Sequence, residues 1–386
     1  MKHEPPIGPV PRVLGVTVVN VSDWRETRPA GKWAQFFAAL ARRYQIVDIV
    51  QTDPSFPASQ RYLNLARNIR PTKARWLAQA GMNQSLERRR TDVVQRELNR
   101  LGGAIDGIIL HQTLCRPGID RGGRPFAIYT DNTMALTQRL YPPPGAEARR
   151  AARHWVAYEA GICTSAEVVF TCSEWARTSM VEDYGCQPER VVSVGGGANQ
   201  ADEIYVDRNH DRPVALFVGM QFERKGGRVL LDAWPRVRAA IPEAELVIIG
   251  PKRAPARPLP DGVRWLGRLD REALAHAYRS AALFVMPSLF EPFGLVFLEA
   301  MGYGLPCVGS DCCAMPELIR DGESGRIVQR GEPEPLADAL IELLGDPQGL
   351  AVMGRRAHEL VRESGSWDHV AERVATHFWP TTKVSG

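Results

Sequence analysis

Short apolar runs alternate with longer amphipathic segments through the first half of the chain. Five apolar runs of strand length are bounded by polar or turn residues, at residues 14–19, 46–50, 107–111, 126–129 and 168–172. Runs of this length and composition predict buried strands. The segment 32–43 carries Trp33, Phe36, Phe37 and Leu40 at helical spacing. This alternation of strands and helices predicts a parallel sheet covered by helices.

The second half repeats this alternation. It predicts strands at residues 214–218, 245–249, 263–265, 283–286 and 306–309, and helices at 226–239, 270–280, 296–303 and 334–344. Residues 195–197 and the polar run 199–213 predict a linker between the halves. We therefore expect an α/β chain of two Rossmann-like domains. Because open α/β sheets bind ligands beyond the carboxyl ends of their strands, we expect the domains to face a central cleft that holds the ligand.

Composition agrees with a soluble protein of two domains. The chain has 386 residues, of which 44% are hydrophobic and 24% are charged. The apolar stretch 281–287 is much shorter than the roughly 18 residues that span a bilayer. Residues 1–12 are polar and proline-rich, so they do not resemble a signal peptide. The seven cysteines are irregularly spaced and include no C-x-x-C pair, which argues against a disulfide framework or a structural zinc site. A cytoplasmic location is expected, peripheral at the membrane inner face if it contacts a membrane at all.

Positive charge is concentrated in one N-terminal segment. The net charge of +4 is modest and does not suggest nucleic-acid binding. Residues 61–100 nevertheless contain ten Lys or Arg and three acidic residues. This segment could bind an anionic acceptor or contact a membrane surface. The alternative is a pair of solvated, arginine-rich helices.

The most informative stretch runs from Ser288 to Met301 and reads SLFEPFGLVFLEAM. It follows a predicted strand, turns at Pro292 and Gly294, and enters a predicted helix. The first backbone N–H groups of a helix have no internal partner and suit an anion or a sugar hydroxyl. Glu291 precedes the helix and Glu299 lies inside it, so the two carboxylates could each accept a different set of hydroxyls. Taken singly, each glutamate could also be a solvated surface acid.

The stretch resembles the signature of glycosyltransferase family 4, which comprises retaining enzymes of the GT-B fold. The family pattern E-x-F-G-x-x-x-x-E-A-M is matched by Glu291, Phe293, Gly294, Glu299, Ala300 and Met301. The similarity continues through residues 304–310, 316–318 and 321–325, and back to residues 218–227. It covers nearly all of residues 168–375 and is limited to the fold over residues 1–165. The resemblance implies an acceptor-side domain at 1–195, a donor-binding domain at 196–369 and a C-terminal helix within 370–386 that packs back on the first domain.

The resemblance also implies roles for individual residues. Glu291 would hold donor-sugar hydroxyls, Glu299 the ribose hydroxyls, and Lys225 the diphosphate leaving group. The amides of Phe293, Gly294, Leu295 and Val296 would contact sugar and phosphate. The family usually has arginine after the glycine equivalent to Gly219, whereas this chain has Met220, so Arg224 could supply the second cation. The chain contains no Asp-x-Asp metal motif, and a fixed cation could stabilise the leaving group without a metal.

Other candidates follow from their positions in the family. The loop ending in Gly31 and Lys32 corresponds to the N-terminal glycine loop that approaches the donor phosphate. His111 or Asp131 could contact the donor sugar, and either could instead be a core or capping residue. The predicted nucleobase pocket comprises Gly250, Pro251, Lys252, Arg268 and Leu269.

We expect from these features a retaining, metal-independent glycosyltransferase without a cofactor. It would move a hexose-type sugar from a nucleoside-diphosphate sugar to a hydroxyl acceptor, which could be a glycan, a lipid-linked group or a small molecule. Three alternatives stay open: a catalytically silent GT-B partner protein, a sugar-nucleotide epimerase and a phosphorylase. A dinucleotide oxidoreductase is disfavoured because no G-x-G-x-x-G follows a strand.

Overall fold

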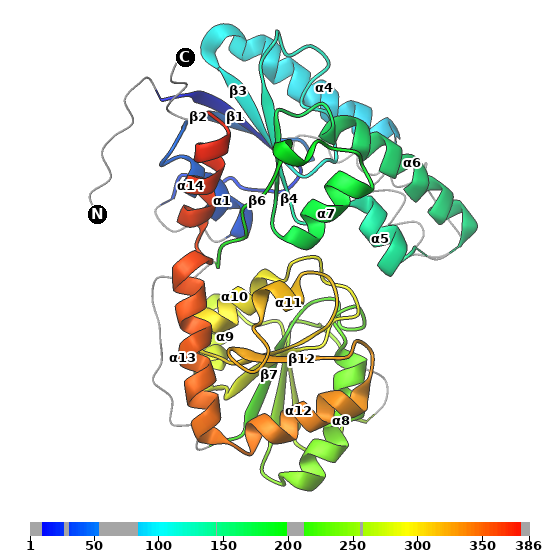
Figure 1. The fold of residues 1–386 in the computed structure, drawn as a ribbon, viewed down its shortest axis with the longest axis vertical. Coiled ribbons are helices and arrows are strands. Elements are labelled where there is room, and N and C mark those ends of the chain that lie inside the picture. The colour runs from blue at the N-terminus through cyan, green and yellow to red at the C-terminus, as the bar shows by residue number, and fades with distance from the viewer. Residues whose placement is uncertain are drawn as a thin grey trace. The chain divides into compact units, whose positions relative to one another are not determined.

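The chain forms two compact units in the computed structural model, which describes residues 10–26, 31–53, 84–143, 145–198, 212–254 and 258–379. The N-terminal unit comprises residues 1–195 together with 367–386, and the C-terminal unit comprises residues 196–366 (Figure 1). Each unit contains one six-stranded sheet whose strand pairs are all parallel.

The N-terminal sheet has the strand order β2-β1-β3-β4-β5-β6. Its strands are β1 (Arg12–Thr17), β2 (Gln45–Gln51), β3 (Gly107–His111), β4 (Phe126–Thr130), β5 (Val168–Thr171) and β6 (Val191–Ser193). The first five agree with the predicted strands within two residues at each end. The sixth was not predicted from the sequence, since it is only three residues long and lies at an edge of the sheet.

Two sets of helices cover the two faces of this sheet. One core cluster joins Phe126 and Ile128 of β4 to α4 (Gln84–Leu101), α6 (Ala146–Cys163) and α7 (Glu174–Glu182). The alternate residue Tyr129 faces the opposite side and stacks on Phe36, with ring centroids 4.4 Å apart. Phe36 belongs to α1 (Lys32–Leu40), which covers this second face. Helix α5 (Met134–Leu140) follows β4 in the chain. The period-two alternation of β4 therefore builds both layers of the core.

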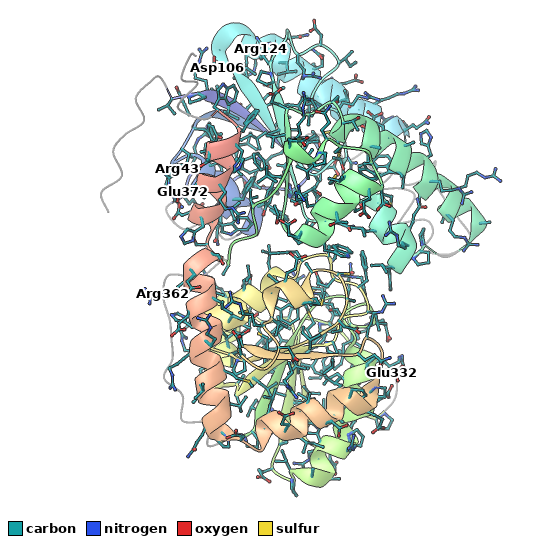
Figure 2. All side chains as sticks on the ribbon, viewed as in Figure 1. Arg43, Asp106, Arg124, Glu332, Arg362 and Glu372 are labelled. Carbon is teal, nitrogen blue, oxygen red and sulfur yellow. The ribbon has the colours of Figure 1, made fainter. Side chains whose placement is uncertain are left out.

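The chain returns to the N-terminal unit through α14 (Trp367–His377), which packs on α1. Trp367 lies against Trp33 and Phe36, with ring centroids 6.0 and 5.7 Å away. The Tyr44 hydroxyl donates a 2.7 Å hydrogen bond to the Phe378 carbonyl. Arg43 and Glu372 form a looser pair at 3.8 Å on the surface (Figure 2). The helix begins three residues before the start predicted from the sequence.

The C-terminal sheet has the strand order β12-β11-β10-β7-β8-β9. Its strands are β7 (Val214–Val218), β8 (Glu245–Ile249), β9 (Val263–Gly267), β10 (Leu283–Met286), β11 (Cys307–Ser310) and β12 (Gly325–Val328). Its helices are α8 (Gly227–Ala240), α9 (Arg271–Ser280), α10 (Leu295–Gly302), α11 (Met315–Leu318), α12 (Pro333–Leu344) and α13 (Pro347–Ser364). Helix α8 packs on α12, and α10 packs on α13. The edge strand β12 was also missed from the sequence.

The strand order of this unit places two loops side by side. Strands β7 and β10 are hydrogen-bonded neighbours and run in the same direction. Residues 219–226 follow β7, and residues 287–294 follow β10, so both loops leave the same edge of the sheet. These are the two segments that carry Lys225 and Glu291. Parallel topology therefore brings together residues 66 positions apart in the sequence.

Candidate functional site

Two cationic side chains converge on one carboxylate where β7 and β10 end. Lys225 Nζ lies 2.8 Å from Glu291 Oε2, and a guanidinium nitrogen of Arg224 lies 3.3 Å from the same oxygen. The three side chains are 14–20% exposed. The structure thus brings together the three charged residues that the sequence assigned to the sugar and diphosphate. Two cations against one carboxylate leave an excess positive charge at the site.

Further contacts fix the direction of both cations. Lys225 Nζ lies 3.3 Å from the sulfur of Met286, the last residue of β10. Arg224 donates hydrogen bonds to the Phe290 carbonyl and to the Gln221 side chain. The backbone N–H groups of Leu289 and Phe290 in turn donate to the Arg224 carbonyl, at 2.9 and 3.3 Å. The two loops therefore hold each other through backbone bonds as well as charges.

Two glycines make room for this arrangement. A Cβ atom on Gly219 would lie 2.3 Å from Lys225 Cδ, so a side chain there would displace the lysine. Gly226 has φ +73°, and a Cβ atom there would lie 1.8 Å from the Pro287 carbonyl oxygen. Glycine is the residue that accepts both a positive φ and such a close approach. Met220, which stands where the family usually has arginine, is 52% exposed.

Helix α10 begins at Leu295, four residues after Glu291. Its N-cap is Gly294, with φ +87°, and no side chain caps the helix. Phe293 is buried, whereas Leu295 and Val296 are half-buried. Because the first N–H groups of a helix have no partner within it, this end can donate hydrogen bonds to a ligand and carries partial positive charge. Contact of these amides with sugar and phosphate stays a prediction.

Glu299 lies in the second turn of α10 and is half-buried. Its Oε2 atom is 3.5 Å from the hydroxyl of Tyr278, which stacks on Tyr303 with ring centroids 5.1 Å apart. Burial, together with the Glu299 charge, raises the pKa of Tyr278 well above its ordinary value. Tyr278 therefore stays a neutral hydrogen-bond donor to Glu299. The sequence did not single out Tyr278, since an aromatic residue at helical spacing reads as core.

The predicted nucleobase residues lie where β8 and β9 end. The Gly250 N–H donates to the Gly267 carbonyl at 2.6 Å, and the Trp265 indole donates to the Pro251 carbonyl at 2.9 Å. Pro251 is buried, Leu269 is half-buried, and Lys252 and Arg268 are exposed. The structure brings these segments together, and their contact with a base stays a prediction.

The N-terminal candidates have more varied environments. His111 is buried at the end of β3, with Nδ1 3.0 Å from the Thr17 hydroxyl and its ring centroid 3.9 Å from that of Trp33. Asp131 is half-buried directly after β4. The exposed Gly31 is the N-cap of α1, which begins at Lys32. Residues 27–30 of the predicted glycine loop and the Lys32 side chain lie outside the described residues.

A buried carboxylate that the sequence did not reveal links the loops after β3 and β4. Glu159 on α6 accepts a 2.8 Å hydrogen bond from the Met134 N–H and further bonds from the Thr113 and Tyr184 hydroxyls. Burial raises the pKa of Glu159 above its ordinary range. A glutamate inside an arginine-rich helix gives no sequence signal of such a role.

Part of the basic segment 61–100 lies outside the described residues, which resume at Gln84. In the described part, Arg90 points inward, is 3% exposed and pairs with Asp53 at 2.6 Å. Arg100 pairs with Glu97 and Asp48. Among the described residues, no helix is long and apolar enough to cross a bilayer, and no cluster of three or more His, Cys, Asp or Glu could hold a metal ion.

Comparison with known families decides the identity of the C-terminal unit. Residues 212–346 match the family model described as glycosyl transferases group 1. They are a group 1 glycosyltransferase domain. The match confirms the family resemblance that the Glu291–Glu299 pattern predicted. The domain includes Lys225, both glutamates and the predicted nucleobase residues.

Curated relatives carry related names. This chain is 34% identical over 210 positions to a phosphatidyl-myo-inositol mannosyltransferase of Mycolicibacterium smegmatis. The match covers 52% of this chain and 54% of the relative. The chain is 31% identical over 277 positions to a D-inositol 3-phosphate glycosyltransferase of Rhodococcus erythropolis, covering 66% and 62%. The chain therefore spans roughly half to two thirds of the length of these relatives.

Solved structures confirm the fold. The chain superposes on a sucrose-phosphate synthase from Thermosynechococcus elongatus with a TM-score of 0.69, covering 95% of this chain and 98% of that one at 19% identity. The chain thus has the two-domain α/β fold of the GT-B class.

Proposed function

We propose that this protein is a retaining glycosyltransferase that moves a hexose-type sugar from a nucleoside-diphosphate sugar to a hydroxyl acceptor. The observation that carries the proposal is the convergence of Lys225 and Arg224 on Glu291 beside the start of α10. All three belong to the group 1 glycosyltransferase domain. A diphosphate that entered this place would meet two fixed cations and a helix N-terminus.

The pairing of these residues suggests how the donor would bind. A diphosphate oxygen would replace Glu291 as the partner of Lys225 and Arg224. The carboxylate released from them would then accept hydroxyls of the donor sugar, as charge-assisted hydrogen bonds. Glu299, held by Tyr278, would accept the ribose hydroxyls. The positive site thus exchanges an internal anion for the anion of the substrate.

In the proposed reaction, the bond between the anomeric carbon and the diphosphate oxygen breaks while the acceptor oxygen bonds to that carbon on the same face. The proton of the acceptor hydroxyl passes to the leaving phosphate oxygen, so no side-chain nucleophile is required. Lys225, Arg224 and the α10 N-terminus stabilise the charge that develops on the diphosphate, which is the task that a metal ion performs in other transferases. His111 or Asp131 would contact the donor sugar.

We further propose that the acceptor is a polyol that carries a phosphate, either free or lipid-linked. The two relatives support this proposal because both names contain an inositol with an attached phosphate. The basic segment 61–100 would add affinity for such an anion or for a membrane surface. The inward-facing Arg90 would take no part in that contact.

Thermal unfolding in the presence of nucleotide sugars tests the proposal. UDP-, GDP-, ADP- and TDP-sugars would be added in EDTA to the wild type, to Glu299→Ala and to Glu243→Ala, a control at an exposed position. At 100 times its dissociation constant, a donor should add about 2.7 kcal/mol of stability. We expect one nucleotide class to stabilise the wild type and the control but not Glu299→Ala. If no nucleotide sugar stabilises the wild type, even with metal restored, the transferase proposal fails.

A further inference from the structure

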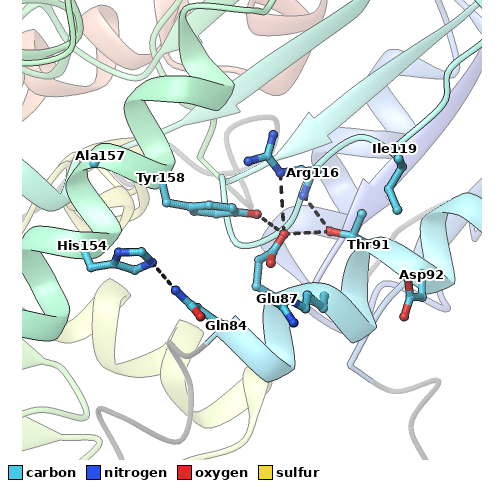
Figure 3. Close-up of a pocket in the computed structure, with 10 residues that line it drawn as sticks. Gln84, Glu87, Thr91, Asp92, Arg116, Ile119, His154, Ala157 and Tyr158 are labelled. Carbon is cyan, nitrogen blue, oxygen red and sulfur yellow. Dashed lines mark hydrogen bonds and ion pairs between the residues drawn. The ribbon is translucent and has the colours of Figure 1, made fainter.

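A pocket of about 510 Å³ opens in the N-terminal unit between α4 and α6 (Figure 3). It is lined by the first half of α4, by the middle of α6, and by Arg116 and Ile119 from the segment after β3. Arg90 in the first half of α4 contacts Asp53 just after β2 and the Leu114 carbonyl after β3, so this part of the helix lies at the carboxyl edge of the sheet. Ligands of open α/β sheets bind at that edge. The pocket size falls within the range of small-molecule sites.

A buried carboxylate forms the centre of this pocket. Glu87 is 9% exposed, and its Oε1 atom accepts hydrogen bonds from the Tyr158 hydroxyl at 2.7 Å and the Thr91 hydroxyl at 3.1 Å. Arg116 Nε lies 4.0 Å from the same oxygen. Figure 3 shows these groups meeting around Glu87 from both helices and from the loop. Burial and the Glu87 charge raise the pKa of Tyr158, so its hydroxyl stays protonated and donates to the carboxylate.

The second oxygen of Glu87 is the feature that points to a ligand. All of these contacts are made by Oε1, and among the described residues Oε2 has no hydrogen-bond or ion-pair partner. A carboxylate can accept about four hydrogen bonds, so Glu87 has capacity for further donors from a ligand in the pocket. A vicinal pair of ligand hydroxyls would supply the missing donors. The carboxylate therefore suits a hydroxyl-rich ring.

The rim of the pocket adds positive charge and further polar groups. Arg88 and Arg116 are both exposed at the pocket, with Asp92 as the single exposed acid beside them. The Gln84 amide and the His154 ring are joined by a 2.7 Å hydrogen bond that links α4 to α6. Two guanidinium groups at one opening suit a phosphate or carboxylate group, because each presents several N–H donors in a fixed plane.

We propose that this pocket binds the acceptor of the transferase, as a polyhydroxylated ring that carries an anionic group. Glu87 accepts the ring hydroxyls, and Arg88 and Arg116 bind the anion. This inference rests on the proposed function, because it takes the ligand to be the acceptor of the transfer reaction. Binding of the ligand can be measured without any transfer reaction. Nothing in the donor-binding residues of the C-terminal unit contributes to this pocket.

The test is calorimetric titration of the full chain with D-inositol 3-phosphate and, separately, with inositol. Three variants accompany the wild type: Glu87→Gln, Arg88→Ala and the control Arg96→Ala, an exposed arginine on the same helix that does not line the pocket. Hydrogen bonds to charged groups contribute enough for a change of about tenfold or more in affinity. Arg88→Ala should weaken binding of D-inositol 3-phosphate by about tenfold and should change binding of inositol little. Glu87→Gln should weaken both probes by about tenfold, and Arg96→Ala neither.

Two outcomes would overturn the inference. One is wild-type protein that binds neither probe while a nucleotide sugar still binds, which leaves the transferase proposal intact and removes the pocket from it. The other is binding that Arg88→Ala and Arg96→Ala reduce equally, which indicates general attraction to a basic helix. Because Glu87 is buried, its variant counts only if it unfolds at the wild-type temperature, and Arg88→Ala at the surface tests the inference independently.

Discussion

The two units hold their buried and half-buried carboxylates in different ways. In the C-terminal unit, Glu291 is held by two cations within 3.3 Å. In the N-terminal unit, Glu159 and Glu87 are held mainly by neutral donors, namely hydroxyls and a backbone N–H. A carboxylate between two cations can be replaced by another anion. A carboxylate that accepts hydrogen bonds from protein hydroxyls can also accept them from the hydroxyls of a ligand. We therefore propose a diphosphate as the ligand of the first region and a polyol as the ligand of the second.

The sharpest way to break this comparison is to remove a cation from Glu291. We expect Lys225→Ala to lower kcat/KM by about 100- to 1000-fold, since a fixed charge that stabilises the transition state is lost. Steady-state transfer assays on the wild type and on Arg228→Ala, a solvent-exposed cation paired with Glu223, provide the reference. Activity of Lys225→Ala within threefold of the wild type would contradict the role given to this lysine.

The next effect concerns stability. Glu291→Ala leaves Lys225 and Arg224 beside each other, mostly buried and without their shared anion. Removing one partner of such a pair costs about 3 kcal/mol of unfolding free energy. Urea unfolding should therefore show a lower midpoint for Glu291→Ala, while Glu332→Ala, at an exposed position, should unfold like the wild type. An unchanged midpoint for Glu291→Ala would mean that the cations do not depend on this carboxylate.

A smaller change tests the geometry around Lys225 without touching a charge. Gly219→Ala places a methyl group 2.3 Å from Lys225 Cδ and must move the lysine. We expect kcat/KM to fall by about tenfold, in line with the sensitivity of catalysis to displacements of about 1 Å. Gly103→Ala, where a Cβ atom would meet nothing within 4 Å, is the control. Equal activity of the two variants would show that the lysine position is not constrained by Gly219.

The smallest effect is a pH dependence in the N-terminal unit. Burial raises the pKa of Glu159 above its ordinary value in the folded protein. A carboxyl of this kind contributes stability at low pH and loses that contribution as pH rises through its folded pKa. The free energy of unfolding of Glu159→Gln should therefore increase relative to that of the wild type as pH rises above about 4.3, the ordinary pKa of glutamate. Parallel pH profiles for the two proteins would contradict this assignment.

Much of the fold could be predicted because both sheets are parallel. A strand buried on both faces reads as a continuous apolar run, and residues 107–111, 214–218, 245–249 and 283–286 were predicted with the observed ends. The missed strands, β6 and β12, are three and four residues long and lie at sheet edges. The run Val-Val-Ser of β6 is too short to stand out as a strand, and β12 contains Gly325 and Arg326 among its four residues.

The two regions also differed in how far the site could be predicted. The residues around Glu291 lie in two short loops with glycines at close approaches, so the sequence records both the chemistry and the geometry. The pocket around Glu87 is assembled from α4, α6 and the segment after β3, which are far apart in the sequence. Its key residue is a glutamate in an arginine-rich helix. Only tertiary structure reveals that Glu87 is buried beside Tyr158 and Thr91.

The central claim is that Glu291, beside Lys225 and Arg224, occupies the position that a donor diphosphate takes when it binds. The most direct test is calorimetric titration, in EDTA, of the nucleotide sugar that stabilises the wild type, on the wild type and on Lys225→Ala. The account predicts that the donor binds the wild type without metal and binds Lys225→Ala at least about tenfold more weakly. Equal affinity for the two proteins, or binding to the wild type only when metal is added, would contradict it.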